Sequence, residues 1–225
     1  MMTYNTAKQR CSHRHLLLEL LSIALRDGRH AIIGLQEVMA WNDFTIKNKG
    51  YSFYTFENCD CGIVVPSIWS IRDSCHSKRF MVLAFESFMV ISMHLVWWGD
   101  EDGAEILEHL FISITAIRNK HVLGADLPLI ILTDANVSLK RNWSIDEQSI
   151  SHSNISEQHF VSGPLTVNGS HNEKDKLAFV SFCHCLGLSA LNTWDWQSSS
   201  TTNHNQTGSC TYFSRSSEGS NSHID

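Results

Sequence analysis

Residues 31–38 read AIIGLQEV, an apolar run that ends in an amide and a carboxylate. A run this short, rich in isoleucine and bounded by polar residues, indicates a buried β-strand. Because the ends of neighbouring strands converge at the rim of a sheet, a carboxylate in this position can meet polar groups from other strand ends. The stretch therefore predicts a sheet-based fold with Glu37 at a rim.

The same patterns recur on both sides of this stretch. Apolar runs predict strands at residues 62–65, 80–85, 88–95, 127–133, 188–192, 210–213 and 222–225. Apolar residues at helical spacing predict helices at residues 12–25, 104–119 and 174–186, the last of them ended by Gly187. Residues 140–162 and 197–209 have no period and are expected to be loops. The mixture indicates one α/β sandwich domain covering residues 1–225.

Composition limits the classes of function. The chain has 225 residues, 43% of them hydrophobic, and a formal net charge of -6, so there is no overall positive field to attract nucleic acid. A phosphate substrate would have to be captured locally, for example by a divalent cation among carboxylates. Seven cysteines without a CxxC pair or a secretory framework indicate a reduced setting. We expect a soluble intracellular monomer, nuclear or cytoplasmic, without a membrane span.

Polar residues at the ends of the expected strands form the candidate site. They are Asn5, Glu37, His94, Asp134, Asn136 and Asp225. Sites of one or two carboxylates with open water positions are what Mg²⁺ prefers, and substrate phosphate then supplies further ligands. Each residue also has a simpler interpretation: Glu37 as a surface carboxylate, Asp134 and Asn136 as turn caps, and His94 as a core histidine. A zinc site is a weaker alternative, because the spacing lacks CxxC geometry; its candidate ligands are Cys59, Cys61, Cys183 and Cys185, with Cys75 and His76.

The short motifs that contain these residues resemble the motifs of a known family. The order TYN at residues 3–5, LQE at 35–37, MHL at 93–95, TDAN at 133–136 and SHID at 222–225 resembles the DNase I-like endonuclease/exonuclease/phosphatase superfamily. Residues 163–193 are similar to its retrotransposon endonuclease-like branch. The resemblance implies a four-layer sandwich of two mixed β-sheets flanked by helices. It also implies that the fold is truncated at the C-terminal end, lacking the final strand and a Ser-Asp-His motif.

The resemblance also implies a role for each residue. Glu37 would be the principal ligand of Mg²⁺ or Mn²⁺, and Asn5 would support the metal or hold phosphate. Asp134 would position or deprotonate the attacking water, and Asn136 would donate to a phosphate oxygen. His94 would protonate the leaving oxygen or bind phosphate. Asp225 resembles an aspartate that orients a further histidine, which does not follow in this sequence.

The function implied is divalent-metal-dependent hydrolysis of a phosphodiester, with DNA as the expected substrate and an endonuclease as the expected activity. Two alternatives stay open. His94 occupies a position where the DNase I and sphingomyelinase branches have histidine, which leaves room for a phosphatase or a sphingomyelinase-type phosphodiesterase. The missing Ser-Asp-His motif and Thr133, where the family motif begins with glycine, leave room for a catalytically inactive remnant.

Overall fold

A computed structural model of the chain describes residues 2–5, 31–38, 50–97, 102–120, 127–137, 173–189, 212–213 and 221–222. The chain divides into two compact units, one comprising residues 1–95 and 109–135 and the other residues 96–108 and 136–225. We describe each unit by itself. The expectation of a single domain over residues 1–225 stays a prediction.

The first unit contains a sheet in which four strands are ordered β1-β2-β4-β3. Their bounds are β1 (Met2–Asn5), β2 (Ile33–Gln36), β3 (Tyr51–Thr55) and β4 (Cys61–Pro66). The strands β1 and β2 run parallel, whereas β4 pairs antiparallel with both β2 and β3. Every residue of β2 and β4 is buried, as the apolar runs in the sequence predict.

A second sheet of the same unit has the order β5-β6-β7-β8. Its strands are β5 (Asp73–His76), β6 (Phe80–Ala84), β7 (Met89–His94) and β8 (Leu129–Asp134). The first three strands are antiparallel, and β8 is parallel to β7. Each sheet therefore combines one parallel pair with antiparallel neighbours, which makes both sheets mixed.

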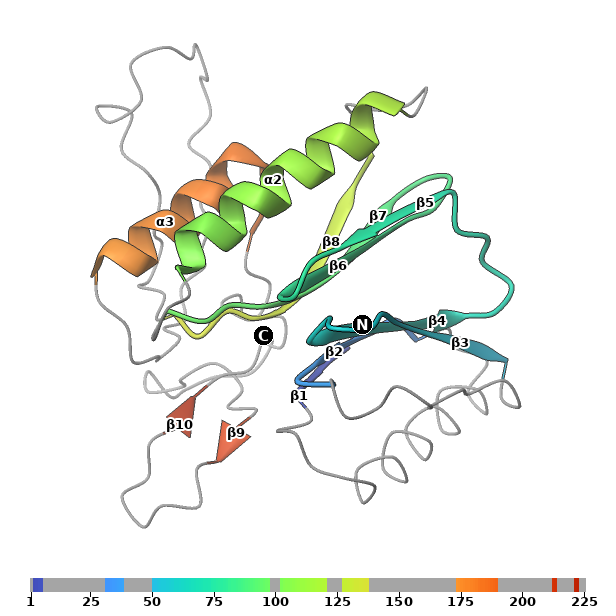
Figure 1. Cartoon of the computed structure of the whole chain (residues 1–225), viewed down its shortest axis with the longest axis horizontal. Coiled ribbons are helices and arrows are strands. Elements are labelled where there is room, and N and C mark those ends of the chain that lie inside the picture. Colours follow the sequence, from blue (N-terminus) through green and yellow to red (C-terminus); the bar gives the residue numbers. More distant parts are fainter. Residues whose placement is uncertain are drawn as a thin grey trace, which may run out of the picture. The chain divides into compact units, whose positions relative to one another are not determined.

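The two sheets pack face to face, and Figure 1 shows them as two adjacent layers. Their inner faces form an apolar core with a cluster of buried residues that comprises Ile32, Cys59, Cys61, Ile63, Val65, Met81, Leu83, Phe85, Val90 and Leu132. Burying an aliphatic side chain of this size stabilises the fold by about 1.5 to 3 kcal/mol. A core of this kind tolerates a polar group only when the group finds hydrogen-bond partners.

Helix α2 (Gly103–Lys120) covers the outer face of the second sheet from His109 onward. The ring of His109 packs edge-on against Phe80 with centroids 5.3 Å apart, and Lys120 forms an ion pair of 3.2 Å with Asp73 of β5. Within this unit the structure thus describes three layers, helix on sheet on sheet (Figure 1).

The described residues of the second unit include helix α3 (Glu173–Cys185) and two short antiparallel strands, β9 (Tyr212–Phe213) and β10 (Asn221–Ser222). Gly187 ends α3 in the left-handed conformation with φ 65°. The amide of Leu188 then donates to the carbonyl of Cys183 at 2.8 Å, and the amide of Gly187 to that of His184 at 3.1 Å. This is the glycine-dependent helix end that the sequence predicts.

The fold class is confirmed, because helices accompany two mixed sheets packed face to face. The structure differs from the strands expected from the sequence in three places. The strand β5 was not predicted since its sequence, DSCH, is polar, and β3 was not predicted either. Residues 188–189 form no strand, because they belong to the helix end. The expected helix at 12–25 and loops at 140–162 and 197–209 lie outside the described residues.

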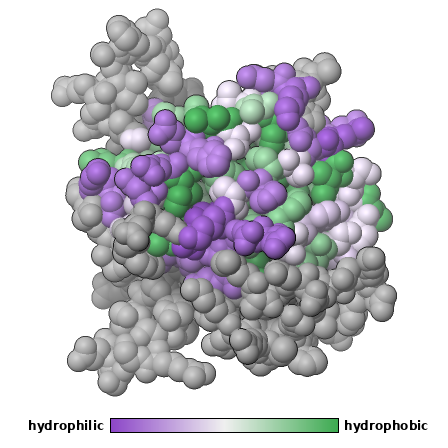
Figure 2. Space-filling model, in the orientation of Figure 1, coloured by the Kyte–Doolittle hydropathy of each residue, from purple (hydrophilic) through white to green (hydrophobic). Residues whose placement is uncertain are grey.

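The surface of the described part is mostly polar. Figure 2 shows hydrophilic residues over much of the face in view, with smaller hydrophobic areas between them. Large hydrophobic side chains exposed among the described residues are Ile68, Phe111, Ile112 and Leu177. Neither helix that the structure describes is long and apolar enough to cross a membrane.

Candidate active site at the strand ends

The two parallel strand pairs bring distant parts of the sequence together. In the first sheet Asn5 is in register with Gln36, and Glu37 follows immediately. In the second sheet His94 is in register with Asp134, and both residues end their strands. Because residues in register on adjacent parallel strands point to the same face, His94 and Asp134 share one side of their sheet. Three of the predicted residues, Asn5, His94 and Asp134, therefore end strands, and Glu37 directly follows the end of β2.

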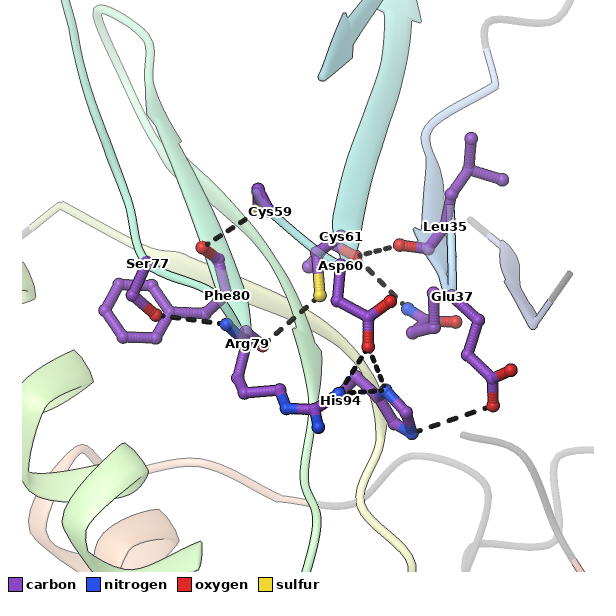
Figure 3. Close-up of polar contacts among 11 residues, drawn as sticks. Leu35, Glu37, Cys59, Asp60, Cys61, Ser77, Arg79, Phe80 and His94 are labelled. Carbon is purple, nitrogen blue, oxygen red and sulfur yellow. Dashed lines mark hydrogen bonds and ion pairs between the residues drawn. The ribbon is translucent and has the colours of Figure 1, made fainter. Parts of the chain in front are cut away.

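His94 faces groups from the other sheet through both ring nitrogens, as Figure 3 shows. Its Nδ1 lies 2.8 Å from Oδ2 of Asp60, and its Nε2 lies 3.9 Å from Oε1 of Glu37. Only 7% of the His94 side chain is exposed. The imidazole is thus bounded by one buried carboxylate and one accessible carboxylate.

Sequence reasoning did not find Asp60 and Arg79, which both lie close to Nδ1 of His94. Asp60 lies in the loop before β4, where its amide donates to Lys78 at 2.7 Å and its carbonyl accepts from Val38 at 3.1 Å. Arg79 precedes β6, and its carbonyl accepts the amide of His94 at 2.9 Å. These backbone hydrogen bonds fix both residues beside the imidazole. The sequence signal was a charged residue directly before a buried strand, which is too common to be diagnostic.

One carboxylate oxygen of Asp60, Oδ2, makes hydrogen bonds to two side chains. Nη1 of Arg79 donates to Oδ2 at 2.5 Å, and His94 reaches the same atom. The other oxygen, Oδ1, is buried and meets no hydrogen-bond donor among the described residues. With 1% of its side chain exposed, Asp60 is a buried carboxylate stabilised through one atom by a guanidinium and an imidazole.

The electrostatics assign the imidazole tautomer. Burial by itself raises the pKa of Asp60, but the hydrogen bond and charge of His94, together with the charge and hydrogen bond of Arg79, hold that pKa below its ordinary value of 3.8. Asp60 is therefore ionised at neutral pH and can only accept, so Nδ1 of His94 carries a proton. The 3.4 Å between Arg79 Nη1 and Nδ1 then separates two donors that share an acceptor. Nε2 is left directed toward Glu37.

Glu37 has an unusual backbone conformation. Its φ is 59°, in the left-handed region where a side chain with a Cβ is disfavoured. Strain of this kind costs about 1 to 3 kcal/mol and persists where surrounding structure enforces it, often at functional sites. The turn directs the carboxylate of Glu37 toward His94, with 21% of its side chain exposed.

The other predicted residues are placed as follows. Asp134 is buried at the end of β8, and its carbonyl accepts the amide of Leu95 at 2.9 Å. Asn136, in the second unit, is half-buried with φ 50°, a conformation that asparagine tolerates. The structure describes the backbone of Asn5 in β1. Asp225 lies outside the described residues.

Cys59 and Cys61 flank Asp60 but are not arranged as metal ligands. Sγ of Cys59 donates to the carbonyl of Phe80 at 3.5 Å, and Sγ of Cys61 to that of Arg79 at 3.2 Å (Figure 3). Burial raises the pKa of Cys59 to about 11 and that of Cys61 well above its ordinary value. In this structure both thiols are hydrogen-bond donors to backbone carbonyls. The zinc alternative stays a prediction.

A hard divalent cation fits the available donors better. Within the described ranges, no three His, Cys, Asp or Glu side chains gather into an all-protein metal cage. Mg²⁺ does not need one, because it keeps several waters and is held by one or two carboxylates with substrate phosphate. The side chain of Glu37 is 21% exposed and lies 3.9 Å from Nε2 of His94, whereas the buried Asp60 hydrogen-bonds to Arg79 and His94. The residues present thus fit a cation bound through Glu37.

Comparison with solved structures identifies the fold. A 3'-5' exonuclease, NExo from Neisseria meningitidis, matches with a TM-score of 0.50 at 15% identity, over 88% of this chain and 79% of that one. The human Nocturnin catalytic domain matches with a TM-score of 0.38 at 16% identity, over 54% and 56% of the two chains. The endonuclease domain of the retrotransposon TRAS1 matches with a TM-score of 0.39 at 15% identity, over 60% and 59%.

Comparisons by sequence give no match: no protein-family model and no curated protein is similar to this chain. The chain spans little more than half the length of the Nocturnin domain that it matches. The fold is nevertheless recognisable, because the match to NExo extends over most of both chains. The chain has the fold of the DNase I-like endonuclease/exonuclease/phosphatase superfamily.

Proposed function

We propose that this chain is a divalent-metal-dependent phosphodiesterase that hydrolyses the DNA backbone. One observation carries the proposal: Glu37, held at φ 59°, faces Nε2 of His94 while the buried, ionised Asp60 holds Nδ1. This arrangement places a partly exposed carboxylate beside an imidazole whose orientation is fixed, which supports a site for metal-assisted hydrolysis. It occurs in a fold shared with a 3'-5' exonuclease.

The residues suggest a division of labour for attack of water on phosphorus. A Mg²⁺ or Mn²⁺ ion bound by Glu37 would supply Lewis-acid polarisation of the scissile phosphate. Asp134 would take the proton of the attacking water as the new P–O bond forms. His94 would donate its Nε2 proton to the leaving oxygen as the old P–O bond breaks. Asn5 and Asn136 would hold phosphate oxygens.

Asp60 and Arg79 would support His94 in this scheme. Asp60 accepts the Nδ1 proton of His94 and so holds the ring in the orientation from which a protonated Nε2 would donate to the leaving oxygen. Arg79 donates to the same carboxylate oxygen and so favours the ionised form of Asp60. The pair therefore acts through His94 and touches no reacting atom.

The experiment is nicking of supercoiled plasmid by the full chain in Mg²⁺ or Mn²⁺. Glu37→Ala should abolish nicking, and EDTA should do the same. Glu57→Ala is the matched control, because Glu57 is an exposed carboxylate in the loop before β4 and should keep wild-type activity. Loss of activity in the control as well as in Glu37→Ala would contradict the assignment of Glu37.

A second candidate is hydrolysis of a small or lipid phosphoester. It is favoured by the net charge of -6, which gives no overall attraction to DNA. A folded sample that releases p-nitrophenol from bis(p-nitrophenyl) phosphate or hydrolyses sphingomyelin, but does not nick plasmid, would replace DNA with this substrate class. A folded sample without either activity would favour an inactive remnant.

A further inference from the structure

A buried polar clamp joins the two sheets directly behind the candidate site. Nε2 of Gln36 donates to Oγ of Ser92 at 3.1 Å and to the carbonyl of Leu132 at 3.3 Å. Oγ of Ser92 in turn donates to the carbonyl of Leu35 at 3.0 Å. These hydrogen bonds connect β2 of the first sheet with β7 and β8 of the second. We call Gln36 and Ser92 the inter-sheet clamp.

The donor and acceptor roles in the clamp are mutually consistent. The two N–H groups of the Gln36 amide have one acceptor each, and the Ser92 hydroxyl accepts one hydrogen bond and donates its own proton to another. Exchanging the oxygen and nitrogen of Gln36 would direct an acceptor at the carbonyl of Leu132. The network therefore has one favourable arrangement.

Stability alone does not account for an amide at this position. Gln36 and Ser92 are both 0% exposed and lie between apolar sheet faces. Buried polar groups cost free energy unless fully hydrogen-bonded, and apolar residues of similar volume often serve packing equally well. What hydrogen bonds add is direction, because they select one relative placement of the elements they join.

The clamp lies at a place where the sheets approach closely. Gly34 of β2 has no side chain, and a Cβ there would lie 2.5 Å from Cβ of Leu132 and 3.3 Å from Oγ of Ser92. The absence of a side chain at Gly34 lets β2 come close enough to the second sheet for Gln36 to bond across the gap.

Each clamp group is a near neighbour of a candidate site residue. Gln36 directly precedes Glu37, Ser92 lies two residues before His94, and Leu132 lies two residues before Asp134. A two-residue step along a strand keeps the same face and spans only about 7 Å. A shift between the sheets at the clamp would therefore be transmitted to Glu37, His94 and Asp134.

We propose that Gln36 is a positioning residue whose amide, together with Ser92, sets the separation between Glu37 on one sheet and His94 on the other. The kinetic consequences rest on the proposed function. The geometric consequence does not, because it concerns only the placement of the His94 imidazole relative to the first sheet.

The test uses Gln36→Met, which keeps side-chain volume but removes the hydrogen bonds, Ser92→Ala, and the double variant. Three quantities are measured: plasmid-cleavage kcat and KM, the affinity for Mn²⁺ by calorimetry without DNA, and the ring ¹H–¹⁵N resonances of His94. We expect each single variant to weaken Mn²⁺ binding and to lower kcat by about 10-fold or more with KM little changed. The His94 resonances should shift, and the double variant should resemble the single ones.

Two controls separate positioning from stability. Ser52→Ala removes the 3.0 Å Ser52–Ser67 hydrogen bond of the exposed β3–β4 region and should leave all three quantities unchanged. Val65→Ala removes buried methyl groups from β4 and should lower stability without touching the clamp. If Gln36→Met behaves like Val65→Ala in kcat, Mn²⁺ affinity and His94 resonances, the inference is wrong.

The remaining outcomes are also decisive. Additive effects of Gln36→Met and Ser92→Ala would contradict a single clamp. If Gln36→Met does not fold, the milder Ser92→Ala carries the same comparison. If the wild-type chain neither binds Mn²⁺ nor cleaves DNA, the proposed function fails. In that event unchanged His94 resonances in Ser92→Ala would overturn the inference, and shifted resonances would support it.

Discussion

Nδ1 of His94 and Oδ2 of Asp60 lie 2.8 Å apart, although the two residues belong to parts of the chain that build different sheets. Asp60 precedes β4 of the first sheet, and His94 ends β7 of the second. The hydrogen bond fixes the imidazole across the inter-sheet boundary and leaves Nε2 directed toward Glu37. This relationship orients the imidazole of His94 through residues from the parts of the chain that build both sheets.

Replacement of His94 tests its role in proton transfer. General acid catalysis contributes about 10²- to 10⁴-fold to rate, so His94→Gln should lower kcat by a factor in that range and leave Mn²⁺ binding nearly intact. The matched control is His109→Gln, because His109 packs on Phe80 from α2 and lies on the outer face of the second sheet. A wild-type kcat in His94→Gln would remove the histidine from the mechanism.

Removing the Asp60 carboxylate should destabilise the fold at neutral pH. Asp60→Asn leaves Arg79 and His94 without their buried anion, and breaking such a pair costs about 3 to 5 kcal/mol. Urea unfolding at pH 7 measures this loss. A loss no larger than that of an exposed change such as Glu57→Ala would show that the pair contributes little.

The same variant has a pH signature. The pKa of Asp60 is lowered in the folded state, so its stabilisation is fully present above the unfolded value near 3.8 and is lost as pH falls through the lower folded value. Wild type should therefore lose more stability than Asp60→Asn between about pH 5 and pH 2. Parallel pH profiles for the two proteins would contradict the lowered pKa.

The left-handed backbone conformation at Glu37 should lower the stability of the fold, while its carboxylate is needed for the proposed activity. Glycine accepts φ 59° without strain, whereas alanine keeps a Cβ there, so Glu37→Gly should be more stable than Glu37→Ala by about 1 kcal/mol. Both variants should be inactive because both lack the carboxylate. Chemical unfolding gives the comparison, and equal stabilities would mean that the surroundings do not enforce the left-handed turn.

The buried thiols of Cys59 and Cys61 should react slowly with alkylating reagents. Burial raises the pKa of Cys59 from 9.0 to about 11 and that of Cys61 well above 9.0, which leaves almost no thiolate at neutral pH. Iodoacetamide labelling followed by peptide mapping should modify exposed Cys185 in the native protein but Cys59 and Cys61 only in urea. Rapid native labelling of Cys61 would show that the loop before β4 opens readily.

The sequence predicted the strand-end positions of three candidate site residues because they close apolar runs. Glu37 follows β2, and His94 and Asp134 end β7 and β8, so hydrophobic patterning indicates these positions. Asp60 and Arg79 could not be found in this way. Their proximity arises from backbone hydrogen bonds between the loop before β4 and the β5–β6 hairpin, which no periodicity encodes.

The strands that were missed have a similar physical explanation. An edge strand such as β5 has a neighbour on one side only and presents polar residues that discourage pairing with other chains. Its sequence therefore lacks the apolar signature of an inner strand. The sequence did not predict the inter-sheet clamp either, because nothing in it indicates that Gln36 hydrogen-bonds to Ser92.

The order of the strands has a consequence for how the protein is made. The parallel partners β7 and β8 are separated by α2, and β1 is joined to β2 through more than 25 residues, so neither pair can form by simple hairpin closure. During synthesis Glu37 and Asp60 emerge from the ribosome well before residue 134. The charged groups between the sheets are therefore enclosed only after more than half of the chain has been synthesised, and until then the inner face of the first sheet lacks the second sheet that covers it.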